Sequence, residues 1–136
     1  MADNILEVSG IHTFIGQFHI LEGVDVTVPR GSISVLLGRN GAGKTTTLRS
    51  IMGLTPPRQG AIKLEGVPIN GKRPFAIAQM GIGYVPEHRA IFRELTVREN
   101  LIISQRQRDD LDRHSDFIFE LFPDLKRLYH LPGGNL

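Results

Sequence analysis

The stretch that most constrains this sequence is GRNGAGKT, residues 38–45. It matches the pattern G-x-x-x-x-G-K-[S/T] at every constrained position. The preceding residues, ISVLL, are almost continuously apolar and predict a strand buried on both faces, as in a sheet with parallel strands. The following residues, KTTTLRSIM, place Leu48, Ile51 and Met52 at helical spacing and predict a helix that ends near Gly53. The sequence therefore predicts a strand, a glycine-rich turn and a helix in direct succession.

A glycine-rich turn in this context has the chemistry of a phosphate cradle. Glycines let the backbone fold so that successive N–H groups point into one concavity, and the helix start adds its positive end. We therefore predict that this P-loop, or Walker A motif, binds a nucleotide. Lys44 would reach the β- and γ-phosphates, the Thr45 hydroxyl would ligate Mg²⁺, and Thr46 would donate to the phosphates. The predicted binding residues of the loop are Gly38, Arg39, Asn40, Gly41, Ala42, Gly43, Lys44, Thr45 and Thr46.

The first part of the chain, roughly residues 1–86, is rich in predicted strands. Short β-branched segments bounded by glycine or proline indicate strands at 4–10, 20–29 and 32–38. In VDVTV the three valines would face inward, with Asp25 and Thr27 outward. The remaining elements expected here are a hairpin at 61–69 that turns at Glu65-Gly66, a helix from Pro74 to Met80, and a buried strand at 82–85.

From Leu95 onward the sequence is helical and more charged. Thr96 followed three residues later by Glu99 is a capping-box pattern, which predicts a helix start. A polar connection precedes a further helix, which Pro123 interrupts. One apolar stripe of this helix consists of Phe117, Ile118, Leu121 and Phe122, and we expect Phe117, Phe119 and Phe122 to pack within the helical part.

The composition excludes several classes of protein. The chain has 136 residues, enough for one domain, and no cysteine, so disulfides and thiolate metal sites are excluded. Sixteen basic and 14 acidic residues give a net charge of +2, which does not point to nucleic acid. The N-terminus lacks the features of a signal peptide, and no apolar run is long enough to cross a membrane. We expect a cytoplasmic chain with no direct membrane span.

Two other groups of polar residues do not predict a site. His114, Ser115 and Asp116 are the residue types of a hydrolytic triad, but consecutive residues on a helix point in different directions. The five histidines show no metal-ligand spacing, and we expect no zinc.

Taken whole, LLGRNGAGKTTTLRSIMGLTPPRQGAI resembles the ATP-binding subunits of ABC transporters. GIGYVPEHRAIFRELTVRENL is similar to the family's glutamine-loop segment and the start of its helical subdomain. FIFELFPDLKRLYHLPGGNL resembles a narrower branch, the importers of branched-chain amino acids, urea and related amides. The resemblance implies an α/β fold of the P-loop NTPase class. Residues 1–95 would form an antiparallel β-subdomain with the P-loop strand–helix core, and 96–136 the start of an α-helical subdomain, with the core sheet incomplete.

The resemblance also implies a function. ATP and Mg²⁺ would be the cofactors, and ATP hydrolysis would drive import of branched-chain amino acids or related small amides. The partners would be a second ATP-binding subunit and a transmembrane permease, with no nucleic acid. The permease would dock on the helical part and the loop around residues 87–93 and would hold the protein at the inner face of the cell membrane.

Two further site residues follow from the resemblance less directly. The family usually has glutamine after Val-Pro, where an amide senses Mg²⁺ and the γ-phosphate; here the residue is Glu87, as is common in the importer branch. His88 stands where that branch usually has glycine. The family also places an aromatic residue before a glycine upstream of the P-loop, to stack on adenine. Here that position holds Ile15, with Phe14 beside it, and either residue is a candidate for the base contact.

In the resembled family the closing residues GGNL lead into the signature motif, whose first position is Leu136. The rest of the signature, the Walker B aspartate with its adjacent glutamate, and the switch histidine are not in this sequence. We therefore expect no catalytic residue in this chain and no useful ATP hydrolysis by it. The P-loop strand would lack its neighbours, so the chain is expected to be poorly soluble or partly disordered alone.

Two alternatives remain open from the residues. The chain could be a naturally short nucleotide-binding or regulatory module that binds ATP and releases no phosphate. It could instead be a different P-loop enzyme, such as a small-molecule kinase, although the segment LTVRENL argues against this. Abolition of ATP binding by Lys44→Ala, with no phosphate release, would favour the regulatory module.

Overall fold

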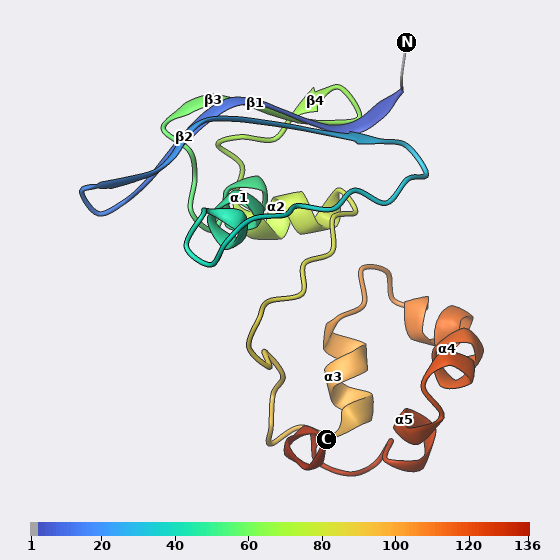
Figure 1. Cartoon of the computed structure of the whole chain (residues 1–136). Helices are drawn as coiled ribbons and strands as arrows, with labels where there is room; N and C mark the ends of the chain where they lie inside the picture. Colours follow the sequence, from blue (N-terminus) through green and yellow to red (C-terminus); the bar gives the residue numbers. More distant parts are fainter. Residues whose placement is uncertain (1–2) are drawn as a thin grey trace. The chain divides into compact units, whose positions relative to one another are not determined.

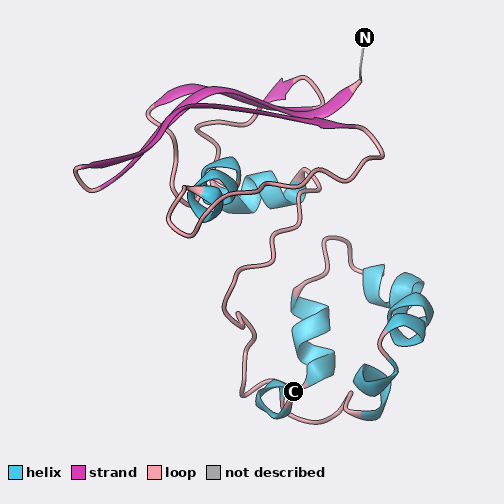
Figure 2. Cartoon of the chain, viewed as in Figure 1, coloured by secondary structure: helices cyan, strands magenta, loops and turns pink. Residues whose placement is uncertain are grey.

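The computed structural model describes residues 3–136. The chain divides into two compact units, and the boundary in the sequence falls between Tyr84 and Val85 (Figure 1). The first unit contains all the strands, and the second is helical (Figure 2). The strands are β1 (Asn4–Ile15), β2 (Phe18–Pro29), β3 (Gln59–Leu64) and β4 (Val67–Pro68). The helices are α1 (Lys44–Ile51), α2 (Pro74–Gln79), α3 (Val97–Ile103), α4 (Asp110–Leu121), α5 (Pro123–Arg127) and a 3₁₀ turn, Gly133–Asn135.

The first unit is an antiparallel sheet with two short helices against one face (Figure 1). The strand order is β2-β1-β3-β4, so β1 lies between β2 and β3. β3 and β4 form the predicted hairpin, and Glu65 and Gly66 have φ angles of 49° and 77°. Two successive left-handed residues are what a tight two-residue hairpin turn requires. The turn predicted at Glu65-Gly66 is therefore confirmed.

The core of this unit lies between the sheet and the helices. Alternation in β2 is as predicted, because Val24 and Val26 pack on the core while Asp25 and Thr27 are exposed. The buried apolar side chains of this core come from β1, β2, β3, both helices, the end of α1 and the segment after β4. They are Val8, Ile11, Leu21, Ile51, Met52, Ile62, Ile69 and Ile77.

Helix α1 begins at Lys44 and stops where the sequence predicts. Gly53 has a φ of 72°, and the N–H of Leu54 donates to the carbonyl of Arg49, as in a glycine-terminated helix end. The buried face agrees with the predicted spacing only in part. Ile51 and Met52 are each 7% exposed, but Leu48 is 48% exposed, and the polar residues Thr46, Thr47 and Ser50 are buried instead. The hydroxyl groups of Thr47 and Ser50 find hydrogen-bond partners and can be buried at little cost.

Two of the strands that the sequence predicts do not form. Residues 32–38 and 82–85 form no strand, and the side chains of Ile33, Leu37 and Val85 are 94%, 85% and 92% exposed. A strand of a parallel sheet becomes buried only when neighbouring strands and covering helices are in place. The described residues place no strand beside either segment. Both segments nevertheless keep the sequence of buried strands.

The second unit is built around α3, whose start is fixed as the sequence predicts. Thr96 accepts a hydrogen bond from the N–H of Glu99, and the Glu99 carboxylate accepts from the N–H of Thr96, which completes the capping box. The carboxamide of Asn100 bonds to the backbone of Phe92 through both its N and its O atoms. Gly133 packs against the same turn and donates its N–H to the carbonyl of Leu95.

The predicted apolar stripe of α4 is packed only in part. Leu111 and Ile118 are buried or half-buried, but Phe117, Leu121 and Phe122 are 61%, 56% and 58% exposed. The expectation that Phe117 and Phe122 pack inside the helical part is therefore wrong, whereas Phe119 is half-buried and its ring lies edge-on to that of Tyr129. The short helices α3 and α5 leave Phe117 and Phe122 uncovered. Within residues 3–136, no helix is both long enough and apolar enough to cross a bilayer.

Candidate nucleotide-phosphate site

The glycine-rich turn leads directly into α1, as its sequence predicts. Gly41 and Gly43 have φ angles of 83° and 96°, and the N–H of Ala42 closes the turn on the carbonyl of Arg39 at 3.0 Å. Gly43 is the N-cap of α1, so the left-handed glycine redirects the chain into the helix. The loop from Gly38 to Ala42 is exposed to solvent, and its backbone is accessible to a ligand.

The N–H groups at the N-terminus of α1 carry a partial positive charge that no side chain of the helix start neutralises. The first four N–H groups of a helix have no partner within it. Gly43 provides no side-chain cap, and the first turn contains no acidic residue. α3, α4 and α5 each have an acidic residue in the first turn. α2 also has neither a side-chain cap nor an acidic residue in its first turn, but it begins with Pro74, which has no N–H to donate there. The N-terminus of α1 is therefore the helix end best prepared for an anion.

Lys44 adds a formal charge at this position. Its ammonium group folds back over the loop and donates a hydrogen bond to the carbonyl of Gly38. Lys44 is half-buried, and Thr45 beside it is exposed. The structure thus brings together the loop amides, the ammonium group of Lys44 and the hydroxyl of Thr45, while Thr46 turns toward the core.

The β1–β2 hairpin packs against the first turn of α1. A Cβ atom on Gly43 would lie 2.7 Å from Cδ2 of Leu21 and 3.7 Å from the carbonyl oxygen of Ile20, so β2 contacts the N-cap itself. At the other end of the turn, the buried hydroxyl of Ser50 bonds to the carbonyl of Thr46 at 2.7 Å. It lies 2.9 Å from the hydroxyl of Thr13 on β1.

Sequence reasoning did not identify Thr13, Leu21 or Ser50 as part of the site. The spacing of Thr46 and Ser50, four residues apart, places two hydroxyl-bearing side chains on one helix face, and this was the available signal. Thr13 gave no signal, because its partner lies 37 residues away in the sequence.

The two candidates for a base contact differ in their surroundings. The ring of Phe14 stacks on His19 at 4.2 Å, and the guanidinium carbon of Arg58 lies 4.2 Å from its centroid. His19 belongs to β2 and Arg58 precedes β3, so both faces of the Phe14 ring have neighbours. Ile15 is 50% exposed.

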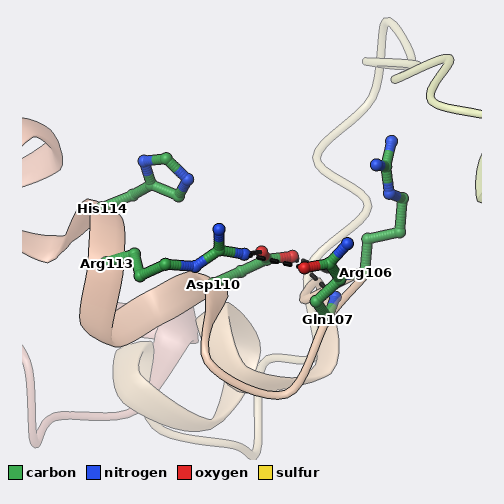
Figure 3. Close-up of a pocket in the computed structure, with 5 residues that line it drawn as sticks. All are labelled: Arg106, Gln107, Asp110, Arg113 and His114. Atoms are coloured by element: carbon green, nitrogen blue, oxygen red, sulfur yellow. Dashed lines mark hydrogen bonds and ion pairs between the residues drawn. The ribbon is translucent and has the colours of Figure 1, made fainter.

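Glu87 belongs to the helical unit and is exposed. That unit contains a shallow pocket of about 420 Å³ between the loop after α3 and the first turns of α4. Figure 3 shows its lining residues, with Arg113 extended toward Asp110 and Arg106 pointing away from that pair. The guanidinium of Arg113 is neutralised by Asp110 at 2.6 Å and by Asp109 at 3.2 Å. The backbone N–H groups of Arg106 and Gln107 also donate to Asp110, and no lining residue is glycine, so this pocket differs from the α1 site.

Comparison with known proteins shows what this arrangement belongs to. The family model described as ABC transporter matches residues 21–131, which include the whole glycine-rich loop and α1. The chain belongs to the ABC transporter family. Within this family it has the P-loop NTPase fold, with the antiparallel β-subdomain at its N-terminus.

Several members of the ABC transporter family are similar over most of this chain. The high-affinity branched-chain amino acid transport ATP-binding protein BraG of Pseudomonas aeruginosa is 36% identical over 134 residues, covering 97% of this chain and 58% of its own length. The probable branched-chain amino acid transport ATP-binding protein LivF of Archaeoglobus fulgidus is 34% identical, covering 88% of this chain and 52% of its own length. The chain thus spans between one half and three fifths of these relatives.

Solved structures give the same family. A nucleotide-free ATP-binding cassette from an ABC transporter superposes with a TM-score of 0.79 at 26% identity, over 98% of this chain and 59% of that one. An ATP-binding subunit of an ABC transporter gives a TM-score of 0.79 at 31% identity, over 93% of this chain and 53% of that one.

Proposed function

We propose that this chain supplies the phosphate-binding part of the ATP-binding subunit of an ABC importer. The observation that carries the proposal is the N-terminus of α1, which has a glycine cap, no acidic residue in its first turn and the ammonium group of Lys44 beside it. In this role the loop amides bind the β- and γ-phosphates of ATP, and Lys44 leaves the carbonyl of Gly38 to neutralise them. Magnesium, when bound, neutralises further phosphate charge.

The remaining contacts of the site are assigned as follows. The Thr45 hydroxyl is exposed beside Lys44 and is the proposed Mg²⁺ ligand in the first unit. Glu87, which is exposed, is the proposed second contact to the metal and its waters, as the resemblance to the family implies. Of the two base candidates we favour Ile15, because both faces of the Phe14 ring already have neighbours.

The similarity to BraG and LivF supports an importer of branched-chain amino acids or related amides as the whole assembly. Its partners would be a second ATP-binding subunit and a membrane permease, which would hold the chain at the inner face of the membrane. A cysteine cross-link from Phe92, exposed in the loop before α3, to a cytoplasmic helix of the permease tests the docking. The described residues provide phosphate contacts, and we propose that they do not by themselves hydrolyse ATP.

The binding proposal is tested by titrating Mg·ATP into the chain in a calorimeter. Lys44→Ala is expected to lower the affinity about 10- to 100-fold, because hydrogen bonds to charged groups contribute about 1.5–3 kcal/mol. Lys63→Ala removes an equal charge from an exposed position on β3 and serves as the matched control. Equal affinities of the Lys44→Ala and Lys63→Ala variants would contradict the proposal. A phosphate-release assay on the same samples tests the absence of hydrolysis.

A further inference from the structure

A chain of buried hydroxyl groups joins strand β1 to the first turn of α1. The Thr13 side chain is fully buried, and that of Ser50 is 2% exposed. Their oxygens are 2.9 Å apart, and Ser50 Oγ also lies 2.7 Å from the carbonyl oxygen of Thr46. In the described residues, every buried side-chain nitrogen or oxygen has a hydrogen-bond partner.

The direction of these hydrogen bonds follows from the donors available. Ser50 has one hydroxyl proton, and the carbonyl of Thr46 can only accept. The Ser50 hydroxyl therefore donates to Thr46, and its lone pair accepts from Thr13. The Thr13 hydroxyl on β1 thus donates to Ser50, and the Ser50 hydroxyl donates to the backbone carbonyl at the end of the first turn of α1. Hydrogen bonds aligned in this way polarise one another in an apolar surrounding.

The first turn of α1 also contacts the β1–β2 hairpin at its start, where Leu21 and Ile20 lie against Gly43. The segment that leads into the loop, residues 32–38, is exposed and has no strand beside it among the described residues. The hairpin therefore fixes the orientation of the turn more than the incoming chain does.

We propose that Thr13 is a positioning residue for the phosphate site. Its hydroxyl, acting through Ser50, holds the Lys44–Thr46 turn so that the loop amides converge on the phosphates. Thr13 itself does not contact the ligand. This inference rests on the proposed phosphate-binding function of the same site and adds a residue to it.

The substitutions Thr13→Val and Thr13→Ser separate the hydroxyl from its packing. Valine keeps the shape of threonine but has no hydroxyl group to donate to the Ser50 oxygen. Serine keeps the hydrogen bond and loses a methyl group. If Thr13 acts through its hydroxyl, serine preserves phosphate binding and valine weakens it. If Thr13 only fills space, valine preserves binding and serine weakens it.

The probe is tripolyphosphate, which has no base and so reports on the α1 site alone. With Thr13→Val we expect the affinity for tripolyphosphate to fall about fivefold, because binding must then restore the order that the Thr13 hydrogen bond of about 1 kcal/mol gave to the turn. ATP affinity falls by the same factor, and Thr13→Ser stays within twofold of the unchanged chain. The double variant Thr13→Val/Ser50→Ala leaves no unpartnered hydroxyl and so keeps the fold; the same fivefold loss is expected.

Three other outcomes would overturn the positioning role of Thr13, and the last of them would overturn the proposed function as well. Unchanged tripolyphosphate affinity in Thr13→Val and in the double variant overturns the positioning role while Lys44→Ala still tests the site itself. A loss for ATP without a loss for tripolyphosphate means that Thr13 acts on the base side, which also overturns it. Absence of tripolyphosphate binding by the unchanged chain overturns both the inference and the proposed function.

Discussion

Replacing Gly43 by alanine should damage the P-loop in two separable ways. Gly43 has a φ of 96°, and a left-handed conformation costs a residue with a Cβ about 1–2 kcal/mol. The new Cβ would also lie 2.7 Å from Cδ2 of Leu21, which is 2% exposed and cannot move into solvent. Overpacking of this kind costs about 1–3 kcal/mol. We expect the free energy of unfolding of the β-rich unit to fall by about 2–5 kcal/mol.

Gly31→Ala is the matched control for the backbone term. Gly31 has a φ of 70°, and its Cβ would meet no atom within 4 Å. Gly31→Ala should therefore lower the free energy of unfolding by about 1–2 kcal/mol because of its backbone conformation, with no added cost from steric overlap. In the double variant Gly43→Ala/Leu21→Ala the overlap is removed, so the two changes should destabilise by less than the sum of the single effects.

Native-state amide hydrogen exchange of β1 and α1 measures this free energy for the first unit separately from the helical one. Equal losses in Gly43→Ala and Gly31→Ala would refute the role assigned to the contact with Leu21. Strict additivity of Gly43→Ala and Leu21→Ala would refute it as well.

Two further predictions concern α1 and α3. Ile51→Ala should destabilise the first unit by about 2–5 kcal/mol, because Ile51 is 7% exposed. Leu48→Ala should destabilise it by less than about 0.5 kcal/mol, because Leu48 is 48% exposed. Chemical denaturation followed by hydrogen exchange distinguishes the two effects. The N–H and then the hydroxyl of Thr96 hold the pKa of Glu99 below its ordinary value of 4.5, so the capping box stabilises α3 above this pH and the stabilisation is lost as the pH falls through the lowered folded-state pKa. Glu99→Gln should flatten the loss of helical circular dichroism on acidification, whereas Glu94→Gln should leave it unchanged; equal acid profiles of the two variants would contradict this.

What could be predicted from the sequence was set by interactions close in the chain. The left-handed turn at Glu65-Gly66, the capping box of Thr96 and Glu99, and the glycine-rich entry to α1 depend on neighbouring residues only. The P-loop residues were accessible to sequence reasoning for the same reason.

The failures all depend on distant partners. Residues 32–38 and 82–85 have the composition of buried strands, but a strand forms only beside another strand, and the described residues supply none there. The burial of Ser50 was missed because a hydroxyl becomes a core group only when a partner such as Thr13 is present. The exposure of Phe117 depends in the same way on which helices lie against α4.

The central claim is that the N-terminus of α1, and not another helix end, binds phosphate. A titration of ¹⁵N-labelled chain with ATP, followed by amide resonances, tests it most directly. The account predicts that the amides of residues 41–46 shift most, and that the capped start of α3 at Thr96–Glu99 stays unchanged. Unmoved amides at 41–46, or equal shifts at the starts of α1 and α3, would contradict it.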